Sequence, residues 1–192
     1  MFADLLRSKL AGIVELGAEQ IKALESHYEL LLRWNRVLNL TAIDSLEEAI
    51  VRHYCESMFL AAHLPGRALT IVDIGTGAGF PGIPVAIFRP DCSVTLVESH
   101  RRKAVFLREA TRRLPNVRVA PNRAEDLGQY FDCAVSRAVS YKDLRPVLKN
   151  VAKSADLLTG SEAPPPQMGF VWEEPIPLPW GRNRFLWKGT AE

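Results

Sequence analysis

The stretch Ile71–Gly82 reads IVDIGTGAGFPG, and it decides the fold of this chain. An apolar run that contains Asp73 ends at Ile74, and glycines then alternate with other residues at positions 75, 77 and 79. Glycine lets a backbone turn sharply and lets a ligand approach it closely, and a helix that follows offers its free N–H groups to an anion. The stretch therefore predicts a strand, a turn that binds a nucleotide-like ligand, and a helix.

Two glycine patterns overlap in this stretch. The pattern Gly77-x-Gly79-x-x-Gly82 matches the fingerprint of dinucleotide-binding proteins, which is weak when it stands alone. The pattern Asp73-x-Gly75-x-Gly77-x-Gly79 is typical of methyltransferases that use S-adenosylmethionine (SAM). Because the apolar run stops at Ile74, directly before Gly75, the second pattern agrees better with the predicted end of the strand.

Outward from this turn, strand and helix patterns alternate. Runs rich in β-branched residues predict strands, and amphipathic stretches between them predict helices, which together indicate right-handed βαβ units. The predicted strands span 69–74, 93–97, 117–120 and 131–135, and the predicted helices span 80–88, 100–114 and 141–153. The expected fold is a Rossmann-like α/β fold, a parallel-rich sheet flanked by helices.

The two ends of the chain differ from this alternating centre. Residues 1–65 show helical periodicity, with one amphipathic helix over 18–38 and another that Pro65-Gly66 stops, so we expect a helical cap at 1–65 and a core at 66–192 within one compact unit. Residues 164–179 hold six prolines, which predict a surface-wrapping segment. Residues 169–172 and 184–187 are candidate closing strands.

Composition excludes several classes of protein. The chain has 24 Lys and Arg against 22 Asp and Glu, a net charge of +2, and 47% hydrophobic residues, which excludes a polycation and global disorder. No apolar run approaches the length of a membrane span, and the N-terminus lacks the pattern of a secretory leader. The cysteines Cys55, Cys92 and Cys133 have no metal-site spacing. We expect a cytoplasmic monomer without a metal.

Candidate ligand contacts follow the predicted strands. Glu98 closes the second strand, where a carboxylate can accept hydrogen bonds from ribose hydroxyls, and Ala124-Glu125 follows the third, where it would lie beside adenine. Arg137 follows the fourth strand, at the same edge of a parallel sheet. Plain structural alternatives stay open: a helix cap for Glu98, a surface turn for Ala124-Glu125, and a surface arginine for Arg137.

The segment 101–123 is strongly basic, with eight Lys and Arg against one Glu. Such clustering anchors nucleic-acid phosphates, although a basic helix face can also be merely solvated. The candidate RNA contacts are Arg101, Arg102, Lys103, Arg108 and Arg112.

Taken together, several short motifs resemble the glucose-inhibited division protein B family over roughly residues 20–150. The Gly-Phe-Pro-Gly-Ile-Pro extension of the glycine stretch is the most specific of them. The motifs are Trp34-Asn35, Asn39-Leu40-Thr41, Arg52-His53, Asp73–Pro84, Leu96-Val97-Glu98-Ser99, Arg123-Ala124-Glu125 and Ser136-Arg137-Ala138.

The resemblance implies a bacterial methyltransferase that moves a methyl group from SAM to N7 of a guanine, position 527, in 16S ribosomal RNA. The expected partner is this RNA or the small ribosomal subunit. By matching position, the resemblance assigns the cofactor contacts Gly75, Phe80, Ala124, Glu125 and Arg137, supported by Gly77, Gly79 and Glu98. Asn39, Arg52 and His53 match family positions without an assigned role.

The chain departs from the family at Glu56, where Asp is usual, at Thr159-Gly160, where Lys-Gly is usual, and in a shorter tail after Gly160. Two alternatives therefore stay open: a SAM methyltransferase with another substrate, and a noncatalytic module that binds SAM or RNA. A nucleotide-dependent oxidoreductase is disfavoured, because the sequence offers no second substrate domain.

Overall fold

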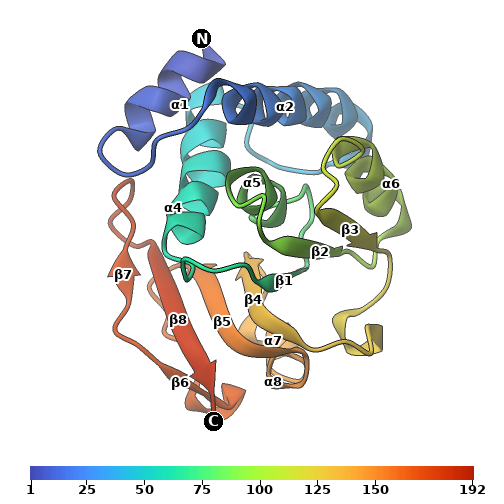
Figure 1. The fold of residues 1–192 in the computed structure, drawn as a ribbon, viewed down its shortest axis with the longest axis vertical. Coiled ribbons are helices and arrows are strands. Elements are labelled where there is room, and N and C mark those ends of the chain that lie inside the picture. Colours follow the sequence, from blue (N-terminus) through green and yellow to red (C-terminus); the bar gives the residue numbers. More distant parts are fainter.

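A computed structural model describes residues 1–192 and contains one eight-stranded sheet with helices on both faces (Figure 1). The strand order is β3-β2-β1-β4-β5-β8-β6, and β7 pairs with β8 beside this path. β1 to β5 are parallel, and β8 is antiparallel to β5. The strands are β1 (Thr70–Ile74), β2 (Ser93–Val97), β3 (Val117–Ala120), β4 (Phe131–Arg137), β5 (Ala152–Thr159), β6 (Phe170–Trp172), β7 (Ile176–Pro177) and β8 (Phe185–Ala191).

The helices divide between the two faces. The larger apolar cluster joins one face of the sheet to α1, α2, α4, α5 and α6, and the smaller joins the other face to α7 and α8 (Figure 1). The helical elements are α1 (Phe2–Leu10), α2 (Ala18–Leu38), α3 (Leu46–Ala49), the π-helix η1 (Ile50–Cys55), α4 (Glu56–Ala62), α5 (Gly82–Phe88), α6 (Arg101–Ala110), the 3₁₀ turn η2 (Ala124–Asp126), α7 (Tyr141–Leu144), α8 (Leu148–Val151) and η3 (Pro166–Met168).

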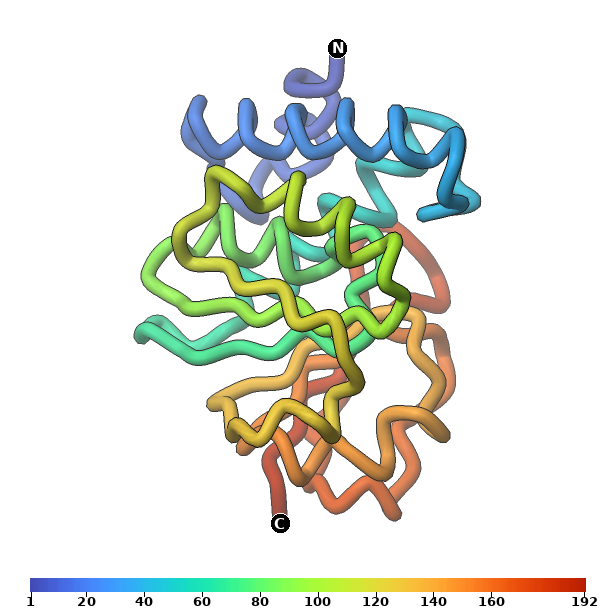
Figure 2. Tube along the Cα trace, turned by 90° about the vertical axis from the view of Figure 1, so that its right-hand side faces the viewer, coloured from blue at the N-terminus to red at the C-terminus, as the bar shows by residue number.

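The longest helix, α2, forms as its sequence predicts. Ile21, Leu24 and Leu31 recur at helical spacing and are all buried, so one stripe of the helix faces the core. The helix ends at Asn39, which has the left-handed conformation (φ 45°) common after helix ends. Figure 2 shows α2 crossing over the layer that contains α5 and α6. No helix in the chain has the length and apolarity that crossing a bilayer requires.

The alternating pattern of strands and helices predicted over 69–135 is confirmed, but the helix predicted over 141–153 is wrong. That stretch forms two single-turn helices, α7 and α8, and then enters β5 at Ala152. Pro146 has no N–H with which to continue the helical hydrogen bonds after Arg145, and the two turns are separate. β5 was not predicted because it has a single β-branched residue, Thr159, and it is a strand because β4 and β8 pair with it on both sides.

The predicted closing strands are confirmed as β6 and β8, although β8 is longer than expected and runs to Ala191. β8 lies inside the sheet between β5 and β6, so the short tail completes the sheet. The proline-rich stretch between β5 and β8 holds η3, β6 and the two-residue strand β7, which joins only β8. The C-terminal segment is therefore part of the sheet as well as a wrapping segment.

Candidate functional site

The glycine turn lies at the carboxyl edge of the parallel strands, directly after β1. The backbone N–H groups of Gly75 and Thr76 both donate to the carbonyl of Val97, at the end of β2, over 3.1 Å each. Gly75 has a φ of +69°, and a Cβ there would lie 2.6 Å from the Val139 side chain. Only glycine therefore fits this first position of the turn.

Asp73 stabilises the glycine turn through hydrogen bonds of its carboxyl group. Its Oδ2 accepts hydrogen bonds from the Thr76 hydroxyl at 2.5 Å and from the Gly82 N–H at 2.8 Å, so the carboxyl group holds the start of α5. The other oxygen, Oδ1, is buried without a partner. Burial raises the pKa of Asp73 to about 7, although both hydrogen bonds and the Arg137 charge lower it. Asp73 therefore titrates near neutral pH.

Glu98, at the end of β2, is bonded to the same turn. Its Oε2 accepts a hydrogen bond from the Gly77 N–H at 3.2 Å, and its Oε1 accepts one from the His100 N–H at 2.8 Å. The side chain is mostly buried. Each carboxylate oxygen keeps a further lone pair, so Glu98 can still accept hydrogen bonds from the hydroxyls of a ligand.

His27, which the sequence analysis did not single out, supports the turn from α2. Its Nε2 donates to the carbonyl of Ala78 at 3.0 Å, because a carbonyl can only accept, and its Nδ1 then accepts from the Tyr54 hydroxyl at 3.1 Å. Burial lowers the pKa of His27 to about 4, so the ring is neutral at pH 7. A lone histidine on a core face of a helix carries no sequence signal for such a contact.

Phe80 contacts two polar side chains, His53 and Arg137. The imidazole of His53 stacks on its ring with centroids 4.5 Å apart, and the guanidinium of Arg137 lies 5.4 Å from the ring centroid. Arg137 donates to the carbonyl of Arg52 at 2.6 Å, while its Nε is buried without a partner, as is Nδ1 of His53. Burial, with the Arg137 charge next in importance, lowers the pKa of His53 to about 3, so His53 is neutral at pH 7.

Ala124 and Glu125 complete the edge. They form η2, which follows β3, and the parallel order β3-β2-β1-β4 places η2, Glu98, the glycine turn and Arg137 along one edge of the sheet. Ala124 is buried, whereas Glu125 is exposed and lies 3.7 Å from the Arg123 guanidinium. The structure thus gathers all the residues predicted to contact the cofactor at one edge.

The unpartnered atoms indicate the kind of ligand that fits. Asp73 Oδ1 can accept a hydrogen bond from an ammonium group, and Arg137 Nε can donate one to a carboxylate. Glu98 can accept from hydroxyls. The edge therefore suits a nucleoside that also carries an amino acid group. The chain has no cluster of three His, Cys, Asp or Glu residues that could hold a metal ion.

The basic residues extend from this edge along α6 and past its C-terminal end. Arg101, Arg102, Arg108 and Arg112 are exposed and Lys103 is half-buried, and none of the five has an ion-pair partner in the chain. Three of them form the first turn of α6, which has no acidic residue. These positive side chains lie at the positive, N-terminal end of the helix dipole, which is unfavourable for them. An anion bound there would be stabilised by the side-chain charges and by the dipole.

Glu56, one of the departures from the family pattern, is paired with the tail. It is almost completely buried, and its two oxygens accept hydrogen bonds from Arg184 Nε at 3.0 Å and Nη2 at 2.6 Å. These residues are 128 positions apart in the sequence, and nothing in either local pattern predicts the pair. Thr159 ends β5, where its hydroxyl donates to the carbonyl of Gly160 at 3.0 Å.

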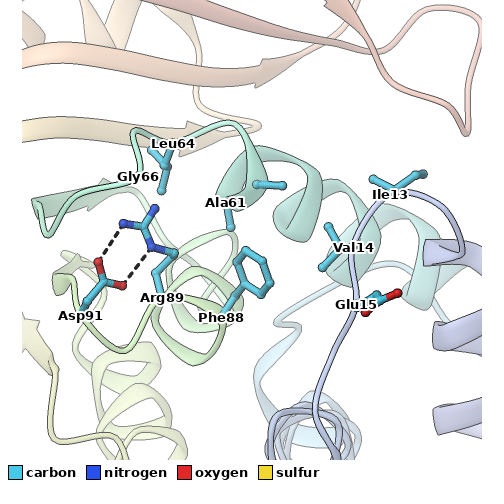
Figure 3. A pocket seen from close by; sticks show the side chains of 10 residues that line it. Ile13, Val14, Glu15, Ala61, Leu64, Gly66, Phe88, Arg89 and Asp91 are labelled. Carbon is cyan, nitrogen blue, oxygen red and sulfur yellow. Dashed lines mark hydrogen bonds and ion pairs between the residues drawn. The ribbon is translucent and has the colours of Figure 1, made fainter.

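A separate hollow lies at the opposite end of the strands, beyond the C-terminus of α5 (Figure 3). Its one arginine, Arg89, donates two hydrogen bonds to Asp91 and others to the carbonyls of Pro65 and Arg67. The charge of Arg89 is therefore satisfied within the protein, which sets this hollow apart from the glycine edge.

Comparison with known proteins gives one family. The family model described as rRNA small subunit methyltransferase G matches residues 20–158. The ribosomal RNA small subunit methyltransferase G of Desulforamulus reducens is 41% identical over 66% of this chain and 56% of its own length. That of Leuconostoc mesenteroides is 32% identical over 95% of this chain and 87% of its own length. The chain thus spans little more than half the length of the first of these relatives.

Solved structures agree on the fold. A SAM-dependent methyltransferase from Aquifex aeolicus has a TM-score of 0.59 at 16% identity and covers 75% of this chain and 93% of its own. A TehB-like SAM-dependent methyltransferase from Corynebacterium glutamicum has a TM-score of 0.57 at 17% identity and covers 88% of this chain and all of its own. At these identities the likeness concerns the fold, and it confirms the predicted Rossmann-like class.

Proposed function

This chain belongs to the rRNA small subunit methyltransferase G family, and from that premise we propose that it transfers a methyl group from SAM to N7 of guanine 527 in 16S ribosomal RNA. The observation that supports the cofactor is the Glu98 carboxylate bonded to the Gly77 N–H of the glycine turn. Fold likeness alone would leave the substrate open, so the family match carries the choice of RNA.

The proposed cofactor contacts follow from the geometry of the edge. Gly75, Gly77 and Gly79 let SAM approach the backbone, Glu98 accepts from its ribose hydroxyls, and Ala124 with Glu125 lies beside its adenine. Asp73 and Arg137 receive its ammonium and carboxylate groups, which satisfy the two atoms that lack partners. Phe80, in contact with His53 and Arg137, forms the apolar wall of this end of the site.

The proposed methyl transfer mainly requires that the two reactants are aligned. When bound, SAM supplies a methyl group already activated by a sulfonium, and N7 of guanine is nucleophilic without losing a proton. The protein therefore needs to orient the two reactants and exclude water, and it needs no general base. His53 agrees with this, because its pKa of about 3 leaves it neutral and a weak base at pH 7.

The basic residues of α6 supply the proposed RNA contacts. Arg101, Arg102 and Lys103 begin the helix next to Glu98, so phosphates bound there would bring a nucleotide to the cofactor edge. Arg108 lies further along the same helix, and Arg112 follows its end. We expect the protein to act as a monomer in the cytoplasm, with residues 1–65 as the cap over the core.

The test is methyl transfer from labelled SAM to small ribosomal subunits that lack the modification, compared with naked 16S RNA. We expect incorporation that mass spectrometry locates as 7-methylguanosine at position 527. Incorporation only into another substrate would assign a different methyltransferase. SAM binding without transfer to any ribosomal substrate would favour a noncatalytic module, and preferential binding of NAD would contradict the cofactor assignment.

A further inference from the structure

A groove runs between α2 and the C-terminal end of α6, away from the cofactor edge. It encloses about 510 Å³ and is walled by α2 on one side and by residues 109–114 on the other. Figure 2 shows α2 lying over α6. The proposed cofactor and RNA contacts account for only one residue of its lining, Arg112.

The rim of the groove is basic, and its charges are free. Lys22 and Arg33 from α2 face Arg112 and Arg113 across the groove, and all four side chains are exposed. None of them forms an ion pair or a side-chain hydrogen bond within the chain. Because these four positive charges are not neutralised by ion pairs within the chain, they remain available to an anionic partner.

The acids of the groove do not cancel this charge. Glu19 and Glu109 also line it, and one oxygen of Glu109 accepts a hydrogen bond from the Trp34 indole at 3.1 Å. Four cations against two carboxylates leave the groove positive. Apolar side chains, among them Leu30, Ile83 and Ile87, also line the groove, so it combines apolar surface with these charges.

This combination matches a nucleic acid strand more closely than a small anion. Phosphates bind to flexible cations on a rim, while bases or sugars cover apolar surface between them. The groove also joins the basic residues of α6, which has 10 residues and thus spans about 15 Å. A strand that lay along α6 would therefore reach from the groove to the cofactor edge.

We propose that the groove between α2 and α6 binds the sugar-phosphate backbone of the RNA segment that flanks the methylated nucleotide. The proposal rests on the proposed function and adds α2 of the cap as a second RNA-binding wall. Lys22 and Arg33 contact phosphates of this segment together with Arg113, and the target nucleotide lies at the other end of α6.

The test compares two charge-reversal pairs of the full chain. Lys22→Glu with Arg33→Glu changes only α2, and the matched control Lys142→Glu with Arg145→Glu changes one Lys and one Arg on the opposite face of the sheet, all of them exposed. Affinity for undermethylated small subunits is measured at several salt concentrations, together with KM and kcat for methyl transfer. SAM affinity is measured by calorimetry.

We expect the groove pair to raise KM for the subunit by about tenfold or more and to lower the salt slope of binding by about 2, one for each lost phosphate contact. SAM affinity and kcat should match the wild type, and the control pair should change neither. If the groove pair behaves like the control while the wild type methylates the subunit, the groove proposal is wrong and the proposed function stands. If the wild type neither binds nor methylates the subunit, both are overturned.

Discussion

The imidazole of His27 donates a hydrogen bond of 3.0 Å to the carbonyl of Ala78, so the longest helix of the cap holds the middle of the glycine turn. The contact joins residues 51 positions apart; the Ala78 carbonyl requires the proton on Nε2, and the Tyr54 hydroxyl donates to the free Nδ1. The N-terminal helices therefore do more than cover the sheet, because the backbone of the proposed cofactor site depends on them.

Replacing His27 should weaken cofactor binding. His27→Phe keeps an aromatic ring but leaves the Ala78 carbonyl and the Tyr54 hydroxyl buried without their partner, at a cost of about 1–3 kcal/mol for each group. We expect a lower melting temperature and several-fold weaker SAM binding by calorimetry. His27→Gln, whose amide can donate to Ala78, should recover part of the affinity.

The matched control is His63→Gln. The imidazole of His63 bonds only to the Phe59 carbonyl of the preceding helix, close to the N-terminal end of β1, so its replacement should leave SAM affinity unchanged. A folded His27→Phe variant with the affinity of the wild type would show that the contact does not position the turn.

The glycine edge was predictable from the sequence because its signals are local. A strand that ends in an acid and alternating glycines, with acids or arginines closing the next strands, places Asp73, Glu98 and Arg137 at one edge of any parallel sheet. His27 and the pairing of Glu56 with Arg184 were not predictable, because each depends on residues brought together by the tertiary fold. β5 was missed for the same reason, since its neighbours make it a strand.

The buried pair of Glu56 and Arg184 gives a second prediction. Arg184→Met removes two hydrogen bonds from the buried Glu56 carboxylate and leaves it the ion pair with Arg52 at 3.7 Å, which should destabilise the protein by about 3 kcal/mol. The double variant Glu56→Gln with Arg184→Met removes both charges and should cost less than the sum of the two single variants. Chemical denaturation of all four proteins measures this coupling, and additive effects would show that the pair is not coupled.

Glu98 carries a third prediction. In Glu98→Gln the amide nitrogen must face either the Gly77 or the His100 N–H, which are both donors, and the negative charge is lost. Hydrogen bonds to charged groups contribute about 1.5–3 kcal/mol, so SAM should bind roughly 10- to 100-fold more weakly. Glu174→Gln, at an exposed position in the C-terminal segment, is the control. Unchanged calorimetric affinity in Glu98→Gln would remove Glu98 from the cofactor site.

The raised pKa of Asp73 predicts how cofactor binding depends on pH. Burial raises it from the ordinary value of 3.8 to about 7, so the folded protein keeps a proton between about pH 4 and 7 that the unfolded chain has lost. The contribution of Asp73 to stability therefore falls as the pH rises through this window. Binding has the opposite sign, because the ammonium group of SAM prefers the ionised carboxylate.

SAM affinity should accordingly rise roughly tenfold between pH 6 and pH 7.5 as Asp73 loses its proton. Asp73→Asn can still accept the Gly82 hydrogen bond through its amide oxygen but does not titrate, so its affinity should be weak and flat over this range. Calorimetry at several pH values distinguishes the two profiles. If the wild type is also flat, or if the Asn variant keeps the rise, then Asp73 does not meet the ammonium group and another residue controls the pH dependence.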